Sequence, residues 1–408
     1  MKCRFCDNDL TITFIDLGSS PPSNSYLSKE KLNEREAFYP LKIFLCENCF
    51  LVQIDEYKKS SEIFSDEYVY FSSYSSSWLS HAKDYVDMVI ERFGINQDWF
   101  IIEIASNDGY LLQNFQKANI PCLGIEPSLK TAAVAKEKKI DVIEDYFGTK
   151  LAKEMVSKDI KADLLIGNNV LAHVPDIKDF IRGLKILLNE TGIITMEFTH
   201  LMQLVDKNLF DTIYHEHFSY LSLMTVKQIF EALRLELFDV EEIPTQGGSL
   251  RIYAKHKEDQ TKSISENVQN LMNKELQKKM DFVDYYQDFQ SKANVVKKDL
   301  HKFLIEQNLN GKKVIGYGAA AKGNTLLNYC EIKADLIKFI VDISPYKQGK
   351  YMPGSHIPIV NEVEIRKFKP DYVLILPWNI KEEIIAQLDY VKKWGCKFVI
   401  PMPKVEVL

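Results

Sequence analysis

The chain has 408 residues, of which 46% are hydrophobic and 26% charged, so a disordered or fibrous protein is excluded and two or three globular domains are expected. Its 51 Lys and Arg against 57 Asp and Glu give a formal net charge of −6, which offers no general attraction to nucleic acid or to an anionic membrane. No apolar run is long enough to cross a membrane and no signal-peptide pattern opens the chain, so a cytoplasmic protein is expected.

Two Cys-x-x-Cys pairs mark the first segment, which we expect to span residues 1–75. The four thiols belong to Cys3, Cys6, Cys46 and Cys49. A two-residue gap lets both thiolates of a turn face one ion, and two such turns complete the closed four-sulfur shell of a structural zinc site. The alternative is four free thiols in a reducing compartment. The segment is rich in turns and is expected to have little core of its own, so that bound zinc would stabilise it.

A run of hydroxyl and aromatic side chains follows at residues 64–78 and includes Tyr68, Tyr70 and Ser73. It leads into a helix expected over residues 81–93. A flexible linker would lack the aromatic residues. The run is typical either of the wall of a polar ligand site or of a capped helix start whose tyrosines lie in the core, and both interpretations stay open.

The next domain, expected over residues 76–258, begins with a pattern typical of a nucleotide-binding α/β unit. An apolar strand over residues 99–105 is followed by a tight turn at 106–109, a helix over 110–118, and a second strand over 122–125 that ends in Glu126. A carboxylate at the end of that second strand can accept both hydroxyls of a ribose. The pattern therefore favours a cofactor that contains adenosine.

The turn after the first strand distinguishes between cofactors. It lacks the G-x-G-x-x-G that brings a pyrophosphate to a helix N-terminus, and it carries Glu103 and Asp108 instead. These acids would repel a pyrophosphate and attract the cationic S-adenosylmethionine, so a methyl donor is favoured over a dinucleotide. A strand over residues 163–169 and the aromatic run near Phe147 should complete the site. The expected cofactor residues are Glu103, Ala105, Ser106, Asn107, Asp108, Glu126, Asp145, Phe147, Asn168 and Asn169.

A polar cluster, Tyr214, His215, Glu216 and His217, lies within apolar surroundings. A catalytic metal would need more ligands than an H-x-H pair supplies, and the HExxH spacing is absent. A structural network of histidines is a second interpretation. The third is acid and base chemistry, because a neutral imidazole can take a proton near pH 7. Further on, residues 247–251 indicate a turn into the last strand, with Arg251 free to meet a phosphate or carboxylate.

A polar helical arm is expected from residue 261 to about 307, packing across the two domains or forming an oligomer contact. The last domain, within residues 259–408, alternates strands at 313–317, 339–341, 371–376 and 397–400 with helices near 325–329 and 381–394, which is typical of a second, smaller Rossmann-like unit.

The first loop of that unit places glycines, a lysine and a hydroxyl at the start of a helix, which favours an anion such as a diphosphate. Lys322 precedes the last glycine, so this is not the ATP-hydrolysing P-loop. Asp342 closes the next strand and could accept from a nucleoside ribose. Lys347 and Lys350, in the loop that follows, could contact the same ligand or be solvated surface lysines, and the second interpretation is favoured. The residues expected to bind a nucleoside diphosphate here are Gly318, Ala320, Lys322, Asn324, Thr325 and Asp342.

Several of these motifs together resemble one family, the C-methyltransferases that act on nucleotide-linked deoxy-keto sugars. They are the two cysteine pairs and the stretches at residues 68–73 (YVYFSS), 103–109 (EIASNDG), 173–176 (HVPD), 214–217 (YHEH), 247–251 (GGSLR) and 316–328 (GYGAAAKGNTLLN). The resemblance covers nearly the whole chain. It implies an α/β protein in which a small four-cysteine zinc segment precedes a Rossmann-like methyltransferase domain and a second, smaller Rossmann-like domain.

The resemblance also implies roles for particular residues. The base that generates an enolate maps to His217, with Glu216 and Tyr214 orienting the substrate or the base. Tyr68 or Tyr70, together with His173, would bind the sugar or hold the enolate oxygen, and Ser73, His215 and Arg251 would contact the substrate. The methylated position would be carbon three of a 4-keto-deoxyhexose. Two positions depart from the family pattern: Gln246 stands where a histidine is common and Thr199 where a proline is expected.

Other functions remain open on the sequence alone. The same residues could methylate a sugar hydroxyl or amine, or the chain could bind a nucleotide sugar without catalysis. An NAD-dependent sugar epimerase would require a Tyr-x-x-x-Lys pair, and none lies at a suitable place in the first nucleotide-binding unit. The nucleotide base and the oligomeric state are not determined by the sequence.

Overall fold

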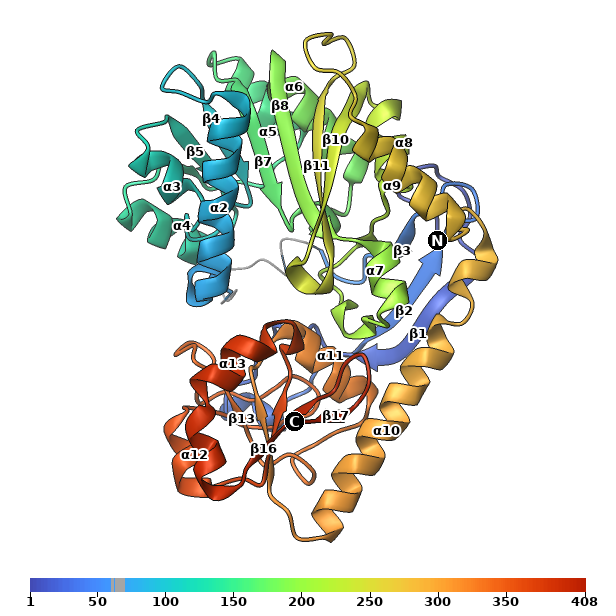
Figure 1. Cartoon of the computed structure of the whole chain (residues 1–408), viewed down its shortest axis with the longest axis vertical. Helices are drawn as coiled ribbons and strands as arrows, with labels where there is room; N and C mark the ends of the chain where they lie inside the picture. The colour runs from blue at the N-terminus through green and yellow to red at the C-terminus, as the bar shows by residue number, and fades with distance from the viewer. Residues whose placement is uncertain (60–61, 63–69) are drawn as a thin grey trace.

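The computed structural model describes residues 1–59, 62 and 70–408, and within them the chain forms three β-sheets. Two α/β units lie one above the other in Figure 1, and the first segment packs against both of them. The helical arm α9 (Glu266–Gln277) and α10 (Phe289–Leu309) runs down one side and connects the two units. Among these residues no helix is both long and apolar enough to cross a bilayer.

The first sheet is antiparallel, in the order β1-β2-β3-β9, with β1 at Ile12–Ser20, β2 at Tyr39–Leu45, β3 at Val52–Ile54 and β9 at Ser219–Tyr220. In β2 the side chains of Leu41, Ile43 and Leu45 are buried and alternate with more exposed residues, as in a sheet with one face on a core. This core is shared with α7 (Leu201–Asp206), α10 and α11 (Ala321–Tyr329). The segment thus has a regular sheet where turns were expected, but its apolar face packs against the rest of the chain.

The second sheet has seven strands in the order β10-β11-β8-β7-β4-β5-β6, all parallel except β11, which runs antiparallel to both neighbours. The strand bounds are β4 (Ile101–Ile104), β5 (Cys122–Ile125), β6 (Val142–Ile143), β7 (Ala162–Asn168), β8 (Leu188–Thr199), β10 (Leu235–Ile243) and β11 (Ser249–His256). All four residues of β4 are buried, as expected for a central parallel strand covered on both faces.

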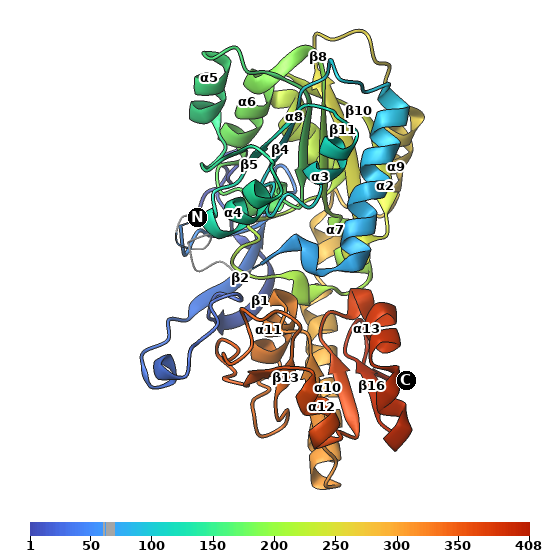
Figure 2. The ribbon, with the colours of Figure 1, turned by 90° about the vertical axis from the view of Figure 1, so that its left-hand side faces the viewer.

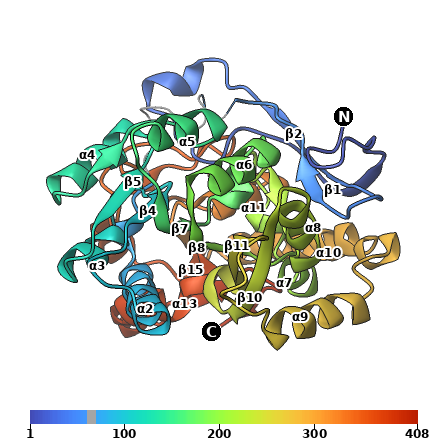
Figure 3. The same cartoon turned by 90° about the horizontal axis from the view of Figure 1, so that it is seen from above.

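Helices cover both faces of this sheet (Figure 3). Because side chains alternate along a strand, Ile101 packs with α2 and α3 while Ile102 packs with α5, α6 and α8 on the opposite face. The helix bounds are α2 (Ser76–Phe93), α3 (Leu112–Lys117), α4 (Leu129–Glu137), α5 (Thr149–Val156), α6 (Ile177–Leu187) and α8 (Leu223–Ala232). Short 3-10 helices are η1 (Glu30–Asn33), η2 (Ser72–Tyr74), η3 (Leu171–His173), η4 (Phe210–Thr212), η5 (Thr245–Gly247) and η6 (Val283–Tyr286).

The third sheet has the order β14-β13-β12-β15-β16-β17, parallel except for the last strand. Its strands are β12 (Val314–Tyr317), β13 (Ile340–Val341), β14 (Ile359–Val360), β15 (Tyr372–Ile375), β16 (Lys397–Ile400) and β17 (Glu406–Val407). Its other helices are α12 (Val363–Phe368), α13 (Lys381–Gln387), η7 (Trp378–Ile380) and η8 (Asp389–Trp394). The chain order reverses at β12, and such reversals are where open parallel sheets bind ligands.

The two units and the first segment meet around the loop that carries residues 210–220. Figure 2 shows β1 and β2 beside the junction of the two α/β units, with α11 directly below it. The arm contributes Val268 and Leu271 to the core of the upper unit and Phe289, Val296 and Leu300 to the lower core, so it packs against both. The ends of the parallel strands in each unit are thereby brought toward a common junction.

Candidate active site

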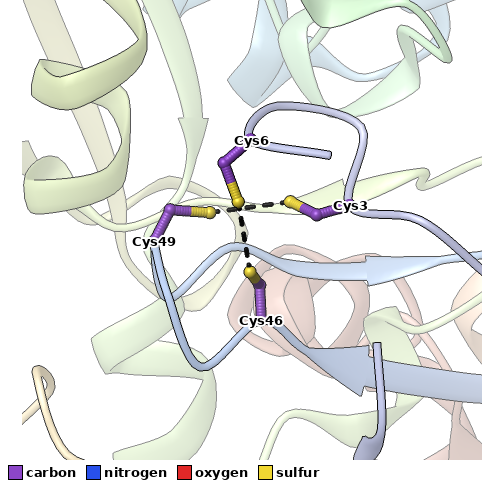
Figure 4. Close-up of side chains that lie close together, drawn as sticks. All are labelled: Cys3, Cys6, Cys46 and Cys49. Atoms are coloured by element: carbon purple, nitrogen blue, oxygen red, sulfur yellow. Dashed lines mark hydrogen bonds between the residues drawn. The ribbon is translucent and has the colours of Figure 1, made fainter. Parts of the chain in front are cut away.

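The four cysteines of the first segment lie together in the structure (Figure 4). Sγ of Cys3 is 3.6 Å from Sγ of Cys49, Sγ of Cys6 is 3.5 Å from Sγ of Cys46, and all four sulfurs lie within 4.8 Å of one another. A tetrahedral zinc ion with bonds of about 2.3 Å holds its sulfurs about 3.8 Å apart, so the cluster fits this ion. Four protein sulfurs leave no coordination position for a substrate, and the zinc is therefore structural.

The carboxyl end of β4 carries buried acidic groups without partners. Glu103 is 1% exposed, and neither of its carboxylate oxygens has a hydrogen-bond partner among the described residues. The same holds for Oδ1 of Asp108 and for the amide of Asn168. Burial, followed by the negative charges of Asp108 and Glu126, raises the pKa of Glu103 well above its usual range. A cationic ligand would supply the missing partners, and this fits the ammonium of S-adenosylmethionine.

The turn after β4 is sharp and presents its backbone to this edge. Ala105 and Asn107 both have positive φ, at 57° and 51°, a conformation that non-glycine residues rarely adopt. Asn107 N–H donates to Glu126 at 2.9 Å, and Ser128 N–H donates to the other oxygen of the same carboxylate at 2.9 Å. Glu126 is thereby held beside the turn. Ser106 lies at the base of the turn with no exposed surface.

Residues 70–74 lie against this turn. Ser72 N–H donates to the side chain of Asn107 at 2.9 Å, and Ser73 N–H donates to Asp108 at 3.2 Å. The carbonyl of Tyr70 accepts from the Asn107 amide at 3.1 Å. Tyr70 and Ser73, two of the residues expected to contact the substrate, thus lie together beside this turn. Tyr68 lies outside the described residues. Lys138, which the sequence did not single out, donates to Ser73 Oγ at 3.1 Å.

The remaining expected cofactor residues lie at the ends of β6 and β7. Asn169 follows β7 with φ of 54°, and its N–H donates to the carbonyl of Glu197 at 2.7 Å. Phe147 packs edge-on against Phe180, with ring centroids 5.3 Å apart, and Asp145 is exposed. Contact of Asp145 or Phe147 with adenine stays a prediction.

His217 is held in one orientation by its own loop. Its Nδ1 lies 2.7 Å from the carbonyl of Thr212, which can only accept, so Nδ1 carries the proton and Nε2 the lone pair. Among the described residues Nε2 has no hydrogen-bond partner, and the side chain is partly exposed. The rings of Tyr214 and His173 lie 3.9 and 4.6 Å from it, centroid to centroid. Burial and the neighbouring His173 lower the pKa of His217 well below its usual value.

The sequence suggested that Glu216 could orient the His217 ring. In the structure it does not, because Nδ1 of His217 donates to the Thr212 carbonyl. Its carboxylate instead accepts two hydrogen bonds from the side-chain amide of Asn24, at 2.8 and 2.9 Å. Burial raises the pKa of Glu216 to about 7. The backbone carbonyl of Glu216 accepts from Nδ1 of His173 at 2.8 Å, and burial lowers the pKa of that histidine to about 4.

His215 anchors the loop to the first sheet. Its Nε2 lies 3.2 Å from the carbonyl of Pro40, and its ring contacts Tyr39 and Tyr57 edge-on. The residues that follow His217 form β9, which pairs with β3 through Val52 and Tyr220. The zinc segment therefore holds the loop from one side, a contact that the sequence did not indicate because β9 has only two residues.

Arg251, which we expected to be free for a ligand, is bound by protein carboxylates. Its guanidinium lies 3.1 Å from Glu197 and 3.3 Å from Glu241, and its side chain is 7% exposed. Glu197 also accepts from Thr245 Oγ1 at 2.9 Å and lies 2.8 Å from Nε2 of His81. These contacts make Arg251 part of a buried charge network at the ends of β8 and β11.

The loop that begins α11 contains most of the other expected residues. Gly318 has φ of 86°, and a Cβ there would lie 2.5 Å from Pro377, so the sharp turn requires glycine. Ala319 N–H donates to Asp342 at 2.7 Å. Asn324 has no exposed surface, and both polar atoms of its amide lack partners among the described residues.

Two side chains at the start of α11 connect the units. Thr325 Oγ1 donates to the carbonyl of Ile213 at 2.8 Å, which attaches α11 to the loop of His217. Lys322 donates to Gln246 Oε1 at 3.1 Å and to Asn379 Oδ1 at 2.8 Å. Gln246, the position that departs from the family pattern, thus connects the two units through Lys322 of α11.

Lys347 was expected to be solvated, and this expectation is wrong. Its side chain is 13% exposed, and its Nζ donates to the carbonyl of Ala319 at 2.8 Å and lies 3.7 Å from Asp342. It also lies over the ring of Tyr26, 5.4 Å from the centroid. The error arose because residues 345–350 form a polar loop in the sequence, and only the tertiary fold shows that it folds back onto β13.

The strand order of the second sheet, the acid-lined turn and the four-cysteine cluster define an S-adenosylmethionine-dependent methyltransferase with a structural zinc segment. Family comparisons agree: residues 3–64 match a zinc binding domain, residues 78–240 a methyltransferase domain, and residues 244–403 the C-methyltransferase C-terminal domain. The chain is 30% identical over 407 residues to C-methyltransferase NovU of Streptomyces niveus, covering 100% of this chain and 96% of the relative. It therefore belongs to this family of C-methyltransferases.

Solved structures match less than half of the chain, at low similarity. The magnesium protoporphyrin IX methyltransferase ChlM of Synechocystis PCC 6803 with bound SAH is 15% identical, with a TM-score of 0.35, and the match covers 43% of this chain and 84% of that one. An S-adenosylmethionine-dependent methyltransferase of Clostridium acetobutylicum ATCC 824 is 10% identical, with a TM-score of 0.34, over 44% and 92% of the two chains.

Proposed function

We propose that the protein transfers the methyl group of S-adenosylmethionine to a ring carbon, carbon three, beside the keto group of a nucleotide-linked 4-keto-deoxy sugar. The product is a branched-chain sugar. The family supports transfer to carbon. The observation that carries the proposal is the environment of His217, whose ring is fixed in the tautomer that leaves Nε2 as an acceptor.

Methylation of a carbon beside a ketone requires a base to take a weakly acidic proton. In this proposal Nε2 of His217 accepts that proton, and the electron pair of the C–H bond becomes part of an enolate. The lowered pKa of His217 keeps the imidazole neutral, and thus able to accept, throughout the neutral range. When bound at the turn after β4, S-adenosylmethionine would supply an electrophilic methyl group to the enolate carbon, and its sulfur would keep the electron pair of the broken S–C bond.

The negative charge that develops on the keto oxygen needs a donor nearby. Tyr214, whose ring lies 3.9 Å from that of His217, and Tyr70, from the segment that lies on the cofactor turn, carry hydroxyls that can donate. His173 cannot, because its one proton lies on Nδ1 and is donated to the Glu216 carbonyl, which leaves Nε2 as an acceptor for a sugar hydroxyl. Burial raises the pKa of Tyr214 well above its usual value, so its hydroxyl keeps its proton and remains a donor. A donor placed at the enolate oxygen stabilises the transition state more than the ground state.

The lower unit would hold the nucleotide. The N-terminus of α11 offers backbone N–H groups, and Lys322 and the orphaned amide of Asn324 lie in its first turn. Thr325 places this helix directly against the loop of His217. A diphosphate bound at α11 would therefore present the attached sugar toward His217.

Mass spectrometry of candidate substrates tests the proposal. TDP-, GDP-, CDP- and UDP-linked 4-keto-deoxyhexoses are incubated with the protein and S-adenosylmethionine, and at least one should gain the mass of one CH2 unit. NMR of the product should place the methyl group on carbon. In deuterated water without methyl donor, the same substrate should exchange its α-hydrogen. A methyl group found on oxygen or nitrogen, without α-hydrogen exchange, would contradict carbon chemistry.

A further inference from the structure

The turn at residues 21–26 of the zinc segment lies between the loop of His217 and the lower unit. Pro21, Pro22 and Ser23 are buried, and the side chains of Asn24 and Tyr26 form hydrogen bonds with other parts of the chain. The sequence indicated only a structural role for this segment. Its contacts show a closer relation to the site.

Within the described part of the chain, the Glu216 carboxylate accepts its hydrogen bonds from Asn24. One amide nitrogen donates to both carboxylate oxygens, at 2.8 and 2.9 Å, and the glutamate is 2% exposed. A buried carboxylate without such donors would be strongly disfavoured. Glu216 in turn holds His173 through its backbone carbonyl and is followed directly by His217. The position of Glu216 therefore sets the positions of both histidines.

Tyr26 attaches the same turn to the lower unit. Its hydroxyl donates to the carbonyl of Ala319 at 2.6 Å, in the loop that begins α11. Lys347 donates to the same carbonyl and covers the ring of Tyr26, and the adjacent Leu27 pairs with Tyr351 through two backbone hydrogen bonds of 3.0 and 2.9 Å. This end of the turn is thus fixed to the loop in which the nucleotide diphosphate would bind.

We propose that Asn24 and Tyr26 are positioning residues of the methyl transfer. Through the three-residue stretch of the zinc segment that contains them, they hold the Glu216 carboxylate and the Ala319 loop at a fixed distance from each other. This inference rests on the proposed function. Glu216 and Ala319 are far apart in the sequence, yet Asn24 and Tyr26 are separated by one residue. The turn therefore sets the distance between the base and the nucleotide-binding loop with little freedom.

The charge around Glu216 gives this role a measurable signature. Besides Asn24, the groups that face the carboxylate are Lys58, whose charge lowers its pKa, and the hydroxyls of Tyr214 and Tyr26. Burial raises the pKa of Glu216 and the Asn24 hydrogen bonds lower it. Removing the Asn24 amide should therefore raise the pKa further, so that the carboxylate is protonated at a higher pH than in the wild type.

The test compares Asn24→Ala, Asn24→Asp and Tyr26→Phe with the wild type on whichever of the four nucleotide keto sugars it methylates. Rates are measured from about pH 6 to 9. We expect Asn24→Ala to lower kcat about 10- to 100-fold, the effect of lost hydrogen bonds to a charged group, and to move the acidic limb of the profile to higher pH. Asn24→Asp should recover relative to Asn24→Ala as the pH falls, because a protonated aspartate again donates to Glu216.

Tyr26→Phe should raise KM for the nucleotide sugar more than it lowers kcat, because it removes the 2.6 Å hydrogen bond to the Ala319 loop and, on the side of the base, only a 3.3 Å contact with Asn24 Oδ1. Asn33→Ala replaces an exposed asparagine of the same segment and should behave as the wild type. Binding of S-adenosylhomocysteine and zinc content should be unchanged in every variant, which excludes a general loss of structure.

The proposal is overturned if the pH profile of Asn24→Ala and the KM of Tyr26→Phe match those of the wild type, or if activity falls only in parallel with zinc content and S-adenosylhomocysteine binding. In these cases the wild type still methylates its substrate, so the proposed function stands. A wild type that methylates none of the four sugars overturns the proposed function, and this inference with it.

Discussion

At the scale of single residues, burial shifts the pKa values of two neighbouring side chains, His217 and Glu216, in opposite directions. Burial lowers the pKa of His217 because it disfavours the imidazolium, and raises the pKa of Glu216 to about 7 because it disfavours the carboxylate. Both groups are thereby brought toward their neutral forms. The histidine becomes a base that is ready near neutral pH, while the glutamate changes charge within the range in which the protein would work.

Replacing His217 tests its role as the base. His217→Asn keeps a polar side chain of similar reach but cannot accept the α-proton as imidazole does. A positioned base contributes about 10² to 10⁴ in rate, so we expect the barrier to rise by about 3 to 5 kcal/mol. Binding of S-adenosylhomocysteine, measured by calorimetry, should remain, because the cofactor edge lies at β4. Turnover close to that of the wild type would remove His217 as the base.

The ionisation of Glu216 should be visible in the pH profile of kcat/KM. The amide of Asn24 donates to the carboxylate, so the ionised form is the one that holds the loop. Protonation disrupts these contacts, and activity should therefore fall as the pH decreases through about 7. In Glu216→Gln this acidic limb should disappear at reduced kcat. A limb that persists at the same pH in this variant would have to be assigned to another group.

At the scale of elements, the helical arm is fixed to the methyltransferase sheet by one buried carboxylate. Glu275 of α9 accepts from the first two backbone N–H groups of α8, those of Leu223 and Met224, at 2.7 and 2.8 Å. It also lies 2.7 Å from Nε2 of His200, and neither side chain is exposed. The carboxylate caps a helix N-terminus and neutralises its partial positive charge. It therefore connects the arm, α8 and the end of β8.

Removing this carboxylate should destabilise the protein markedly. Glu275→Ala leaves two buried N–H groups and a histidine without their acceptor, and we expect the free energy of unfolding to fall by about 3 to 5 kcal/mol. Glu266→Ala changes an exposed residue of the same helix and should have little effect. Urea unfolding followed by circular dichroism measures both. Equal midpoints for the two variants would show that Glu275 contributes little.

The sequence predicted some helices and strands better than others, depending on their length and on the residues that mark their ends. The strands at residues 122–125 and 397–400 were predicted at their observed bounds, since a short apolar run ends before Glu126 in the first and before Pro401 in the second. The two-residue strands β9 and β14 were missed, because two residues carry no periodicity. The helix expected at 325–329 begins earlier, at Ala321, because glycine at 323 packs against Leu376 without breaking it.

The residues of the candidate site likewise fall into those that the sequence predicted and those that it did not. Cys3 and its partners, Glu103 and Glu126 were identified from spacing along the chain, which specifies their local geometry. Asn24, Lys347 and the ion pairs of Arg251 were not, because they depend on contacts between segments far apart in the sequence. The loop with Gly318 was identified from its glycines, but the attachment of Thr325 to Ile213 required the fold.

At the scale of the whole molecule, the zinc segment is a structural part of the candidate active site. Its sheet takes in β9, directly after His217, and its turn contacts both Glu216 and Ala319. Glu36 of the same segment lies 2.8 Å from Nε2 of His356 in the lower unit. The segment therefore joins the two α/β units at the place where, in the proposed function, the methyl donor and the nucleotide sugar would meet.

This arrangement predicts that loss of zinc should affect catalysis more than cofactor binding. Structural zinc contributes on the order of 10 kcal/mol to the folding of small domains, so its removal should release the cysteine turns and the pairing of β3 with β9. The cofactor edge at β4 does not depend on that pairing. We expect a chelator, or Cys46→Ser with Cys49→Ser, to lower kcat at least about tenfold and to raise KM for the nucleotide sugar, since both the base and the binding loop lose their connection.

The affinity for S-adenosylhomocysteine should change much less, and zinc added back to the chelated protein should restore turnover. The matched control is Cys396→Ser, a cysteine of the lower unit outside the cluster, which should retain zinc and activity. Metal content is measured by mass spectrometry beside each rate. If cofactor affinity and turnover fell together, the zinc would support the fold of the entire chain, and the first segment would have no special connection with the loop of His217.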